Sequence, residues 1–365
     1  DKTITINGGP TQGGNTILGS WINNGTFNAG TSTVVFTNTN ATIAGINQFY
    51  NLSVANGATL TPESGSTIRV NGTFANNGTF RADFNPATIE YNGTVVQPFV
   101  SPNGGTGAYY HLVLNNESVT LPAQVNVLGN ITNNANTNFS NTTIVLNGVA
   151  PQVISGAVAP SFQHLQVNNA AGVVLQTDAT IQGTLTLSDG TLQVGTQTLT
   201  LMDDVQFSGT GAFASASTGT IVYGKLSDGQ QVLPGQYGNL SFSNYIKQLP
   251  TAAPVNISGN FLPGTVPQHL TTGTTINFNG DVQTIPAFRF YNLVSSGTGN
   301  KSVSDSAFVQ EVLDVRDGVE LQANGLLVLQ SNANGTARVA RLDDEGTGAI
   351  TGNVIVERYL PAYNP

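Results

Sequence analysis

The sequence contains no cysteine, which excludes disulfide bonds and thiolate metal sites. Charged residues are also scarce: they make up 8% of the chain, against roughly 25% in an average soluble domain. The 11 basic residues form no cluster and the formal net charge is −9, so we expect no binding to nucleic acid or to an anionic membrane surface. No apolar run reaches the length of about 18 residues that a transmembrane helix needs, so we expect no membrane insertion.

The N-terminus lacks the charged start and apolar core of a secretion signal. We therefore expect that any signal peptide has already been removed. Apolar residues reach 39% of the chain and alternate with polar ones, which argues against disorder. Glycine, asparagine, threonine and serine take the place of charge, and uncharged polar side chains suit stacked strands, where ladders of like charges would repel one another.

A short motif occurs five times: an aromatic residue, any residue, Asn or His, and then Leu. A second recurring position, which follows a glycine, always holds a large apolar residue. The leucines of the motif are 60, 53, 75 and 53 residues apart, and such a period indicates an array of repeats. We expect both sets to lie in the core: Leu52, Leu112, Leu165, Leu240 and Leu293 in the motif; Trp21, Phe74, Ile131, Leu185 and Phe261 after the glycine, with Leu313 in the same register.

Each repeat also contains a strand-like segment of four residues. The first is Thr, the second is Val or Ile, the third varies, and the fourth is an aromatic residue or Leu. In four repeats a glutamine step follows, at Gln97, Gln152, Gln231 and Gln283. β-branched residues that alternate with polar ones, separated by Gly and Asn-Gly, are typical of strands and turns. The sequence therefore predicts an all-β fold.

Two all-β architectures compete, a row of β-sandwiches and one parallel β-helix. A sandwich needs ~100 residues, which exceeds the length of one repeat unit, here called a cell. The long spacing of 75 residues exceeds 53 by the length of one additional turn, which we place at residues 191–207. We therefore predict a right-handed parallel β-helix, or β-solenoid, of about six cells of 53–76 residues.

The sequence suggests three segments. Residues 1–18 form an N-terminal strand with a Gly-rich turn, residues 19–342 the solenoid repeats, and residues 343–365 a C-terminal strand and linker. We expect the last strand to leave the solenoid before Pro361 and Pro365.

The segment Gly-Asn-Val-Ile-Val-Glu-Arg-Tyr-Leu-Pro-Ala at residues 352–362 follows cells of Asn-Asn-Gly-Thr-Phe and Phe-Tyr-Asn-Leu type. In this style of repeat the chain resembles the repeat-rich surface and adhesin-type proteins of Bacteroidota that the type IX secretion system exports. The resemblance implies an extracellular or cell-surface location. It also makes Ser306, within Asp-Ser-Ala, a candidate for O-glycosylation, although a plain turn is the alternative.

Few residues suggest chemistry. His111 and His164 occupy the slot that holds Asn in the other motifs, so we expect them to hydrogen-bond a turn, while His269 stands alone. Asp203 and Asp204 have no charged partner one cell away. A third group, Asp343, Asp344 and Glu345, is a candidate Ca²⁺ site with a solvated turn as the alternative. We identify no catalytic residue and no cofactor motif, and expect a protein that is not an enzyme.

We therefore predict an extracellular structural protein that forms a cell-surface fibre with itself, head to tail through its terminal strands. A monomeric adhesin stalk is one alternative, with surface glycans or host cells as partners. A carbohydrate-binding or carbohydrate-processing β-helix is another, and it would need a groove of acids and aromatics. The candidate interface residues are Thr3, Ile4, Thr5 and Ile6 at one end and Val354, Ile355, Val356, Arg358 and Tyr359 at the other.

Overall fold

The computed structural model describes residues 3–6, 19–23, 25–103, 106–266, 268–340 and 346–360. These residues form β-strands joined by turns, and no helix occurs among them. The strands pair in parallel and stack as a β-solenoid of about 15 turns, which confirms the predicted all-β parallel β-helix. The handedness stays a prediction. Within the described residues the antiparallel pair is a small hairpin of β40 (Ser331–Asn332) and β41 (Gly335–Thr336).

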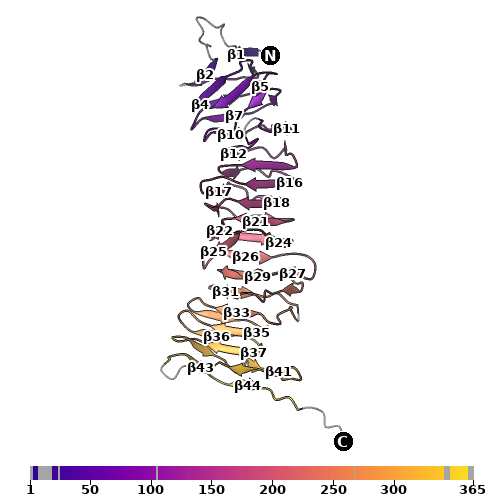
Figure 1. Ribbon diagram of the computed structural model, residues 1–365, viewed down its shortest axis with the longest axis vertical. Helices are drawn as coiled ribbons and strands as arrows, with labels where there is room; N and C mark the ends of the chain where they lie inside the picture. The colour runs from indigo at the N-terminus through magenta and orange to yellow at the C-terminus, as the bar shows by residue number, and fades with distance from the viewer. Residues whose placement is uncertain are drawn as a thin grey trace. The chain divides into compact units, whose positions relative to one another are not determined.

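The chain divides into two compact units. The first comprises residues 1–193 and 206–212, and the second comprises residues 194–205 and 213–365. In each unit the strands follow one another in chain order as stacked turns (Figure 1).

Around each copy of the motif, three strands on successive turns lie side by side: the strand before the motif, the strand that contains the motif leucine, and the strand of the next recurring apolar residue. In the first trio, Val34 of β3 (Thr33–Phe36) pairs with Leu52 of β5 (Asn51–Val54), which pairs with Phe74 of β8 (Phe74–Asn76). The two apolar sets recognised in the sequence are therefore adjacent on neighbouring turns. The other trios are β10 (Thr88–Tyr91), β12 (His111–Leu114) and β15 (Ile131–Asn133); β16 (Phe139–Leu146), β18 (Ser161–Asn168) and β21 (Leu185–Asp189); β26 (Thr220–Tyr223), β29 (Asn239–Phe242) and β32 (Phe261–Leu262); and β33 (Thr275–Phe278), β35 (Phe288–Ser295) and β37 (Ala307–Val315).

These apolar side chains form the core. The five motif leucines are at most 1% exposed, and Phe74, Ile131, Leu185, Phe261 and Leu313 are at most 3% exposed. Trp21 differs because it is only half-buried. Its ring packs edge-on against Phe27 and Phe49, and its Nε1 donates to Asn47 Oδ1 at 2.7 Å.

The motif copies do not line one face of the solenoid. Thr67, Thr88 and His111 are neighbours on successive turns, which are therefore 21 and 23 residues long. A repeat of 53 residues spans a fractional number of such turns, so the three trios of the first unit belong to different sheets, as do the two of the second. Within each unit, the recurring side chains of successive cells therefore lie in different sheets.

In four of the five motif copies the Asn or His bridges two turns, whereas Asn292 donates to Thr275 Oγ1 but its Oδ1 has no partner. Asn51 donates from Nδ2 to Thr33 Oγ1 on the preceding turn at 3.2 Å, and its Oδ1 accepts from the backbone N–H of Thr73 on the following turn at 2.8 Å. His111 and His164 accept the equivalent backbone N–H on Nδ1, each at 2.9 Å. Both histidines thus make the hydrogen bond to the backbone that we expected from the position they share with Asn.

This bridge explains why a glycine begins the four cells in which the bridge forms. A Cβ on Gly129 would lie 2.6 Å from His111 Nδ1 and 2.7 Å from the carbonyl oxygen of Tyr110. The glycines in the same position of the other cells, Gly72, Gly183 and Gly259, face the bridging Asn or His in the same way. Any side chain at this position would therefore displace the bridge.

We predict that Gly129→Ala lowers the free energy of unfolding by about 1–3 kcal/mol, because the methyl group overpacks a closed contact. Urea denaturation followed by circular dichroism measures the change. Gly25→Ala is the matched control, because a Cβ there meets nothing within 4 Å, and an equal loss in both variants would contradict the explanation.

A buried glutamine forms a second link between turns. In the first unit Gln97 donates from Nε2 to the carbonyl oxygens of Val70 and Gly72 at 2.8 and 2.7 Å, while its Oε1 accepts from the N–H of Gly93 at 3.2 Å. Gln152, Gln230 and Gln283 repeat this pattern. We call these four residues the glutamine clamps.

The third clamp corrects the sequence analysis, which assigned the position to Gln231. Gln230 is fully buried and makes the contacts, whereas Gln231 is exposed. Consecutive strand residues point to opposite faces, so a shift of one residue moves the side chain from the core to solvent.

We predict that Gln230→Ala lowers the free energy of unfolding by about 2–4 kcal/mol, because two buried carbonyl groups lose their donor. The adjacent Gln231→Ala should change it by less than about 0.5 kcal/mol. Urea midpoints of the two variants test this, and a larger effect at Gln231 would contradict the clamp assignment.

Two further segments clarify the solenoid. Residues 191–207, expected to add one turn, carry the three strands β22 (Thr191–Gly195), β23 (Thr198–Leu201) and β24 (Val205–Phe207). The last strand, β44 (Val354–Val356), does not leave the solenoid as expected but pairs in parallel with β39 (Leu327–Leu329). Its residues Val354, Ile355 and Val356 pair with Leu327, Val328 and Leu329 of the preceding turn.

Candidate functional site

The most concentrated polar group of the described residues lies around a glutamine clamp of the second unit. The clamp residues Gln97 and Gln152 pair across the sheet with valines, Val119 and Val173. In the second unit Gln230 pairs with Lys247, and Gln283 pairs with Lys301. Both lysines are fully buried, which is unusual for this residue type.

The ammonium group of each buried lysine is hydrogen-bonded. Lys247 Nζ donates to Gln230 Oε1 at 3.0 Å and to Ser243 Oγ at 2.8 Å. Lys301 Nζ donates to the carbonyl oxygens of Gly280 and Thr298 at 2.9 and 2.7 Å and also to that of Asp281. These contacts tie consecutive turns together, so the lysines extend the role of the clamps.

Asp203 and Asp204, which the sequence analysis left without a partner, both pair with Lys225. Its Nζ lies 2.7 Å from Asp203 Oδ1 and 2.9 Å from Asp204 Oδ2. The two carboxylate groups raise the pKa of Lys225 through these hydrogen bonds. The ion pair joins neighbouring turns. Its partners are separated in the sequence by the length of one turn and not by the length of one cell, so the repeat pattern does not reveal them.

His269 lies beside this group and is anchored at both ring nitrogens. Nδ1 accepts from the backbone N–H of Lys247 at 2.9 Å, so the proton resides on Nε2, which donates to the carbonyl oxygen of Pro263 at 2.9 Å. Burial lowers the pKa of His269, and the charge of Lys247 lowers it further. The ring is therefore neutral and links Pro263 to the backbone of Lys247.

Two pairs of buried tyrosines act in the same structural way. The hydroxyl groups of Tyr91 and Tyr109 lie 2.7 Å apart, and those of Tyr223 and Tyr237 lie 2.8 Å apart. Burial raises the pKa of all four phenols. These hydroxyl groups are thus neutral, and they hold the backbone of Val100 and Leu233.

Burial lowers the pKa of Lys247 to about 8, although Asp228 partly opposes the shift. Between pH 8 and the ordinary value near 10.5, the unfolded chain holds a proton that the folded chain has released. Unfolding then takes up a proton, so a rise in pH stabilises the fold in this window.

We predict that Lys247 adds about 2–3 kcal/mol to the free energy of unfolding between pH 8 and pH 10, while the buried tyrosines and Lys225, whose pKa values are raised, act in the opposite direction in both proteins. The variant Lys247→Val, which copies the valine found beside Gln97 and Gln152, should lack this contribution. Measuring both proteins at four pH values isolates the contribution. An identical pH dependence in the two proteins would refute it.

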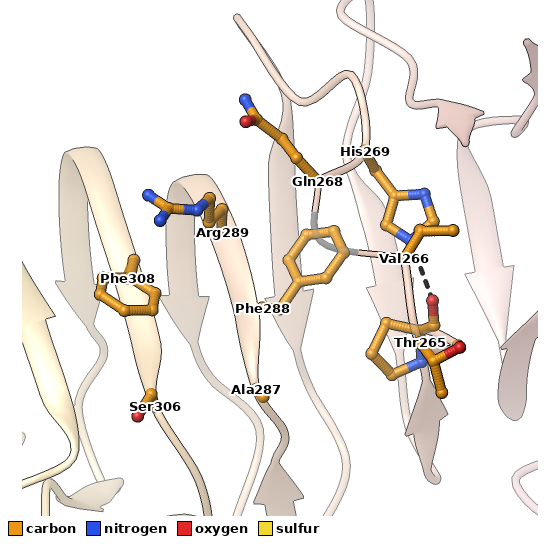
Figure 2. Close-up of a pocket in the computed structure, with 11 residues that line it drawn as sticks. Thr265, Val266, Gln268, His269, Ala287, Phe288, Arg289, Ser306 and Phe308 are labelled. Carbon is orange, nitrogen blue, oxygen red and sulfur yellow. Dashed lines mark hydrogen bonds between the residues drawn. The ribbon is translucent and has the colours of Figure 1, made fainter. Parts of the chain in front are cut away.

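A pocket of about 340 Å³ opens beside His269 (Figure 2). Residues 263–266 and 268–269 form one wall, and β35 and β37 form the other. Figure 2 shows Phe288 pointing toward His269, while Arg289 extends toward Phe308 on the neighbouring strand. Ser306, the candidate glycosylation residue, is exposed and lines the same pocket.

The predicted interface residues lie on outermost strands. In its sheet β1 (Thr3–Ile6) pairs only with β3, and β44 is the last strand after β39. Ile4 is 37% exposed and Val356 is 66% exposed. Arg358 and Tyr359 follow β44 on the surface, where the backbone N–H of Tyr359 donates to Ser331 Oγ at 3.0 Å.

The candidate Ca²⁺ residues Asp343, Asp344 and Glu345 lie outside the described residues. Within the described ranges, no three His, Asp or Glu side chains gather in a way that could hold a metal ion. In the same part of the chain, no helix has the length and apolar character needed to cross a membrane.

Comparisons with family models, with curated proteins and with solved structures each found no match to this chain. The class of the protein therefore rests on its own geometry. It is a repetitive parallel β-solenoid, whose recurring polar residues bind its own backbone and whose outermost strands carry exposed apolar side chains.

Proposed function

We propose that this chain is the subunit of an extracellular fibre, in which β44 of one copy pairs with β1 of the next. The observation that supports this most strongly is the exposure of core positions at both outermost strands. The parallel ladder of one subunit then continues into the next, as in the addition of a strand to an open sheet edge.

The first of these positions is on β1. Ile4 pairs with Val34, which is 1% exposed, and Val34 pairs with Leu52 in the core. Ile4 therefore belongs to the inward column of the solenoid, yet it is 37% exposed, and among the described residues β1 pairs only with β3. A neighbouring copy would cover it.

The same holds for β44. Val356 pairs with Leu329, which is 6% exposed, whereas Val356 itself is 66% exposed. Burying an apolar side chain of this size contributes about 1.5–3 kcal/mol, so several such residues favour association. The contact joins two different surfaces of the same chain, and contacts of this type do not close but propagate into a polymer.

The extracellular location and the absence of enzymatic activity are part of this proposal. The location rests on the resemblance of the repeats to exported surface proteins of Bacteroidota. The non-enzymatic role is supported by the described polar groups, since the buried lysines, tyrosines and His269 all bind neighbouring turns. A monomeric adhesin stalk would instead remain as single particles.

We predict filaments in electron micrographs of the negatively stained protein. Val356→Lys should raise the critical concentration for polymerisation by at least about 100-fold, because the contact would have to bury an unpaired charge. Val149→Lys is the matched control, since Val149 is 96% exposed but is not on an outermost strand. Single particles of wild-type protein at high concentration would contradict the proposal.

A mixing experiment tests the direction of assembly. Ile4→Lys blocks one end of the subunit and Val356→Lys blocks the other, so each variant alone should be monomeric. An equal mixture should form dimers and nothing longer, because one intact end of each variant remains. Dimers of either variant alone, measured by analytical ultracentrifugation, would indicate a symmetric contact and refute head-to-tail pairing.

A further inference from the structure

The pocket beside His269 does not depend on the outermost strands and requires a separate explanation. Its lining comes from residues 263–266 and 268–269 and from strands β35 and β37 (Figure 2). A volume of about 340 Å³ is at the lower end of the range for small-molecule sites, about 300–1,000 Å³. The pocket is therefore large enough for a ligand of one or two rings.

The wall formed by residues 263–266 and 268–269 is fixed by hydrogen bonds and ring stacking. His269 is 3% exposed and uses both ring nitrogens to hold the backbone of Lys247 and Pro263. Its ring stacks on Phe288, with 5.6 Å between the ring centroids. On the opposite side of the segment, the N–H of Thr265 donates to Asn244 Oδ1 at 3.0 Å. The pocket is thus held open by contacts already made in the folded chain.

Arg289 is the one formally charged residue among those that line the pocket. Its guanidinium carbon lies 4.6 Å from the ring centroid of Phe308, and its Nη1 donates to Gln330 Oε1 at 3.3 Å. Within the described residues it forms no ion pair, although acidic residues outnumber basic ones by 20 to 11 in this chain. The remaining N–H groups of a positioned guanidinium favour a carboxylate.

The rest of the lining combines apolar and hydrogen-bonding side chains. Phe288, Phe308 and Val266 supply apolar surface, and Thr265, Gln268 and Ser306 supply hydroxyl and amide groups. A peptide would also need backbone partners, but β35 already pairs with β33 on one side and with β37 on the other. Recognition by side chains alone suits a small, hydroxyl-rich ring.

We infer that this pocket binds a sugar that carries a carboxylate, such as a uronic acid unit of an acidic glycan, with Arg289 as the carboxylate-binding residue. The sugar hydroxyl groups bind Thr265, Gln268 and Ser306, and its apolar face contacts the phenylalanine side chains. The inference is independent of polymerisation, because none of these residues lies on β1 or β44.

Isothermal titration calorimetry of the full chain tests this assignment with three probes: glucuronate, glucose and N-acetylglycine. Glucuronate should bind at least tenfold more tightly than glucose, and added salt should weaken it. Arg289→Gln should remove this tenfold preference. Arg316→Gln, which removes an exposed arginine paired with Asp314, should retain it.

Each other outcome overturns the inference. Equal affinity for glucuronate and glucose, no binding of glucuronate, or an unchanged preference in Arg289→Gln would remove the carboxylate role. Tighter binding of N-acetylglycine than of glucuronate would assign the pocket to a peptide terminus. The urea midpoint of Arg289→Gln, measured alongside, shows that the variant is folded. Filament formation is measured separately, so a negative result for the sugar site does not affect the fibre proposal, and a negative result for the fibre does not affect the sugar site.

Discussion

Each turn of this solenoid is fixed to its neighbours by side chains that hydrogen-bond to the backbone of other turns. Asn51 and His111 represent one such link, and Gln97 represents the other. The paired strands are often only three or four residues long, so the ladder alone provides few hydrogen bonds per turn. Neutral amide and imidazole groups supply the rest, which explains how a chain with 8% charged residues can specify one register.

Much of the fold could be predicted because its core repeats in the sequence. The motif leucines and the large residues after each glycine were recognised as two separate sets, and in the structure they pair directly, as Leu112 does with Ile131. The slot shared by Asn and His likewise indicated a common structural role. Periodicity reveals such features since each copy meets the same packing constraint.

The other features depend on geometry that the sequence does not display. Gln230 and Gln231 are chemically identical, and only the direction of the strand decides which one is buried. Lys225 is 21 and 22 residues beyond Asp204 and Asp203, a distance of one turn that a search by whole cells overlooks. The pocket arises from the positions of residues 263–266 and 268–269, which belong to no repeat and have no periodic signal.

The structure leaves inward-facing residues exposed on its outermost strands, and the proposed fibre follows from this. Because the chain contains no cysteine, the contact can be tested by an Ile4→Cys, Val356→Cys double variant under mild oxidation. Parallel neighbours lie about 4.8 Å apart, within reach of a disulfide. The double variant should form a ladder of covalent oligomers on a non-reducing gel, while each single variant should stay monomeric. Absence of the ladder, or dimers of a single variant, would contradict head-to-tail assembly.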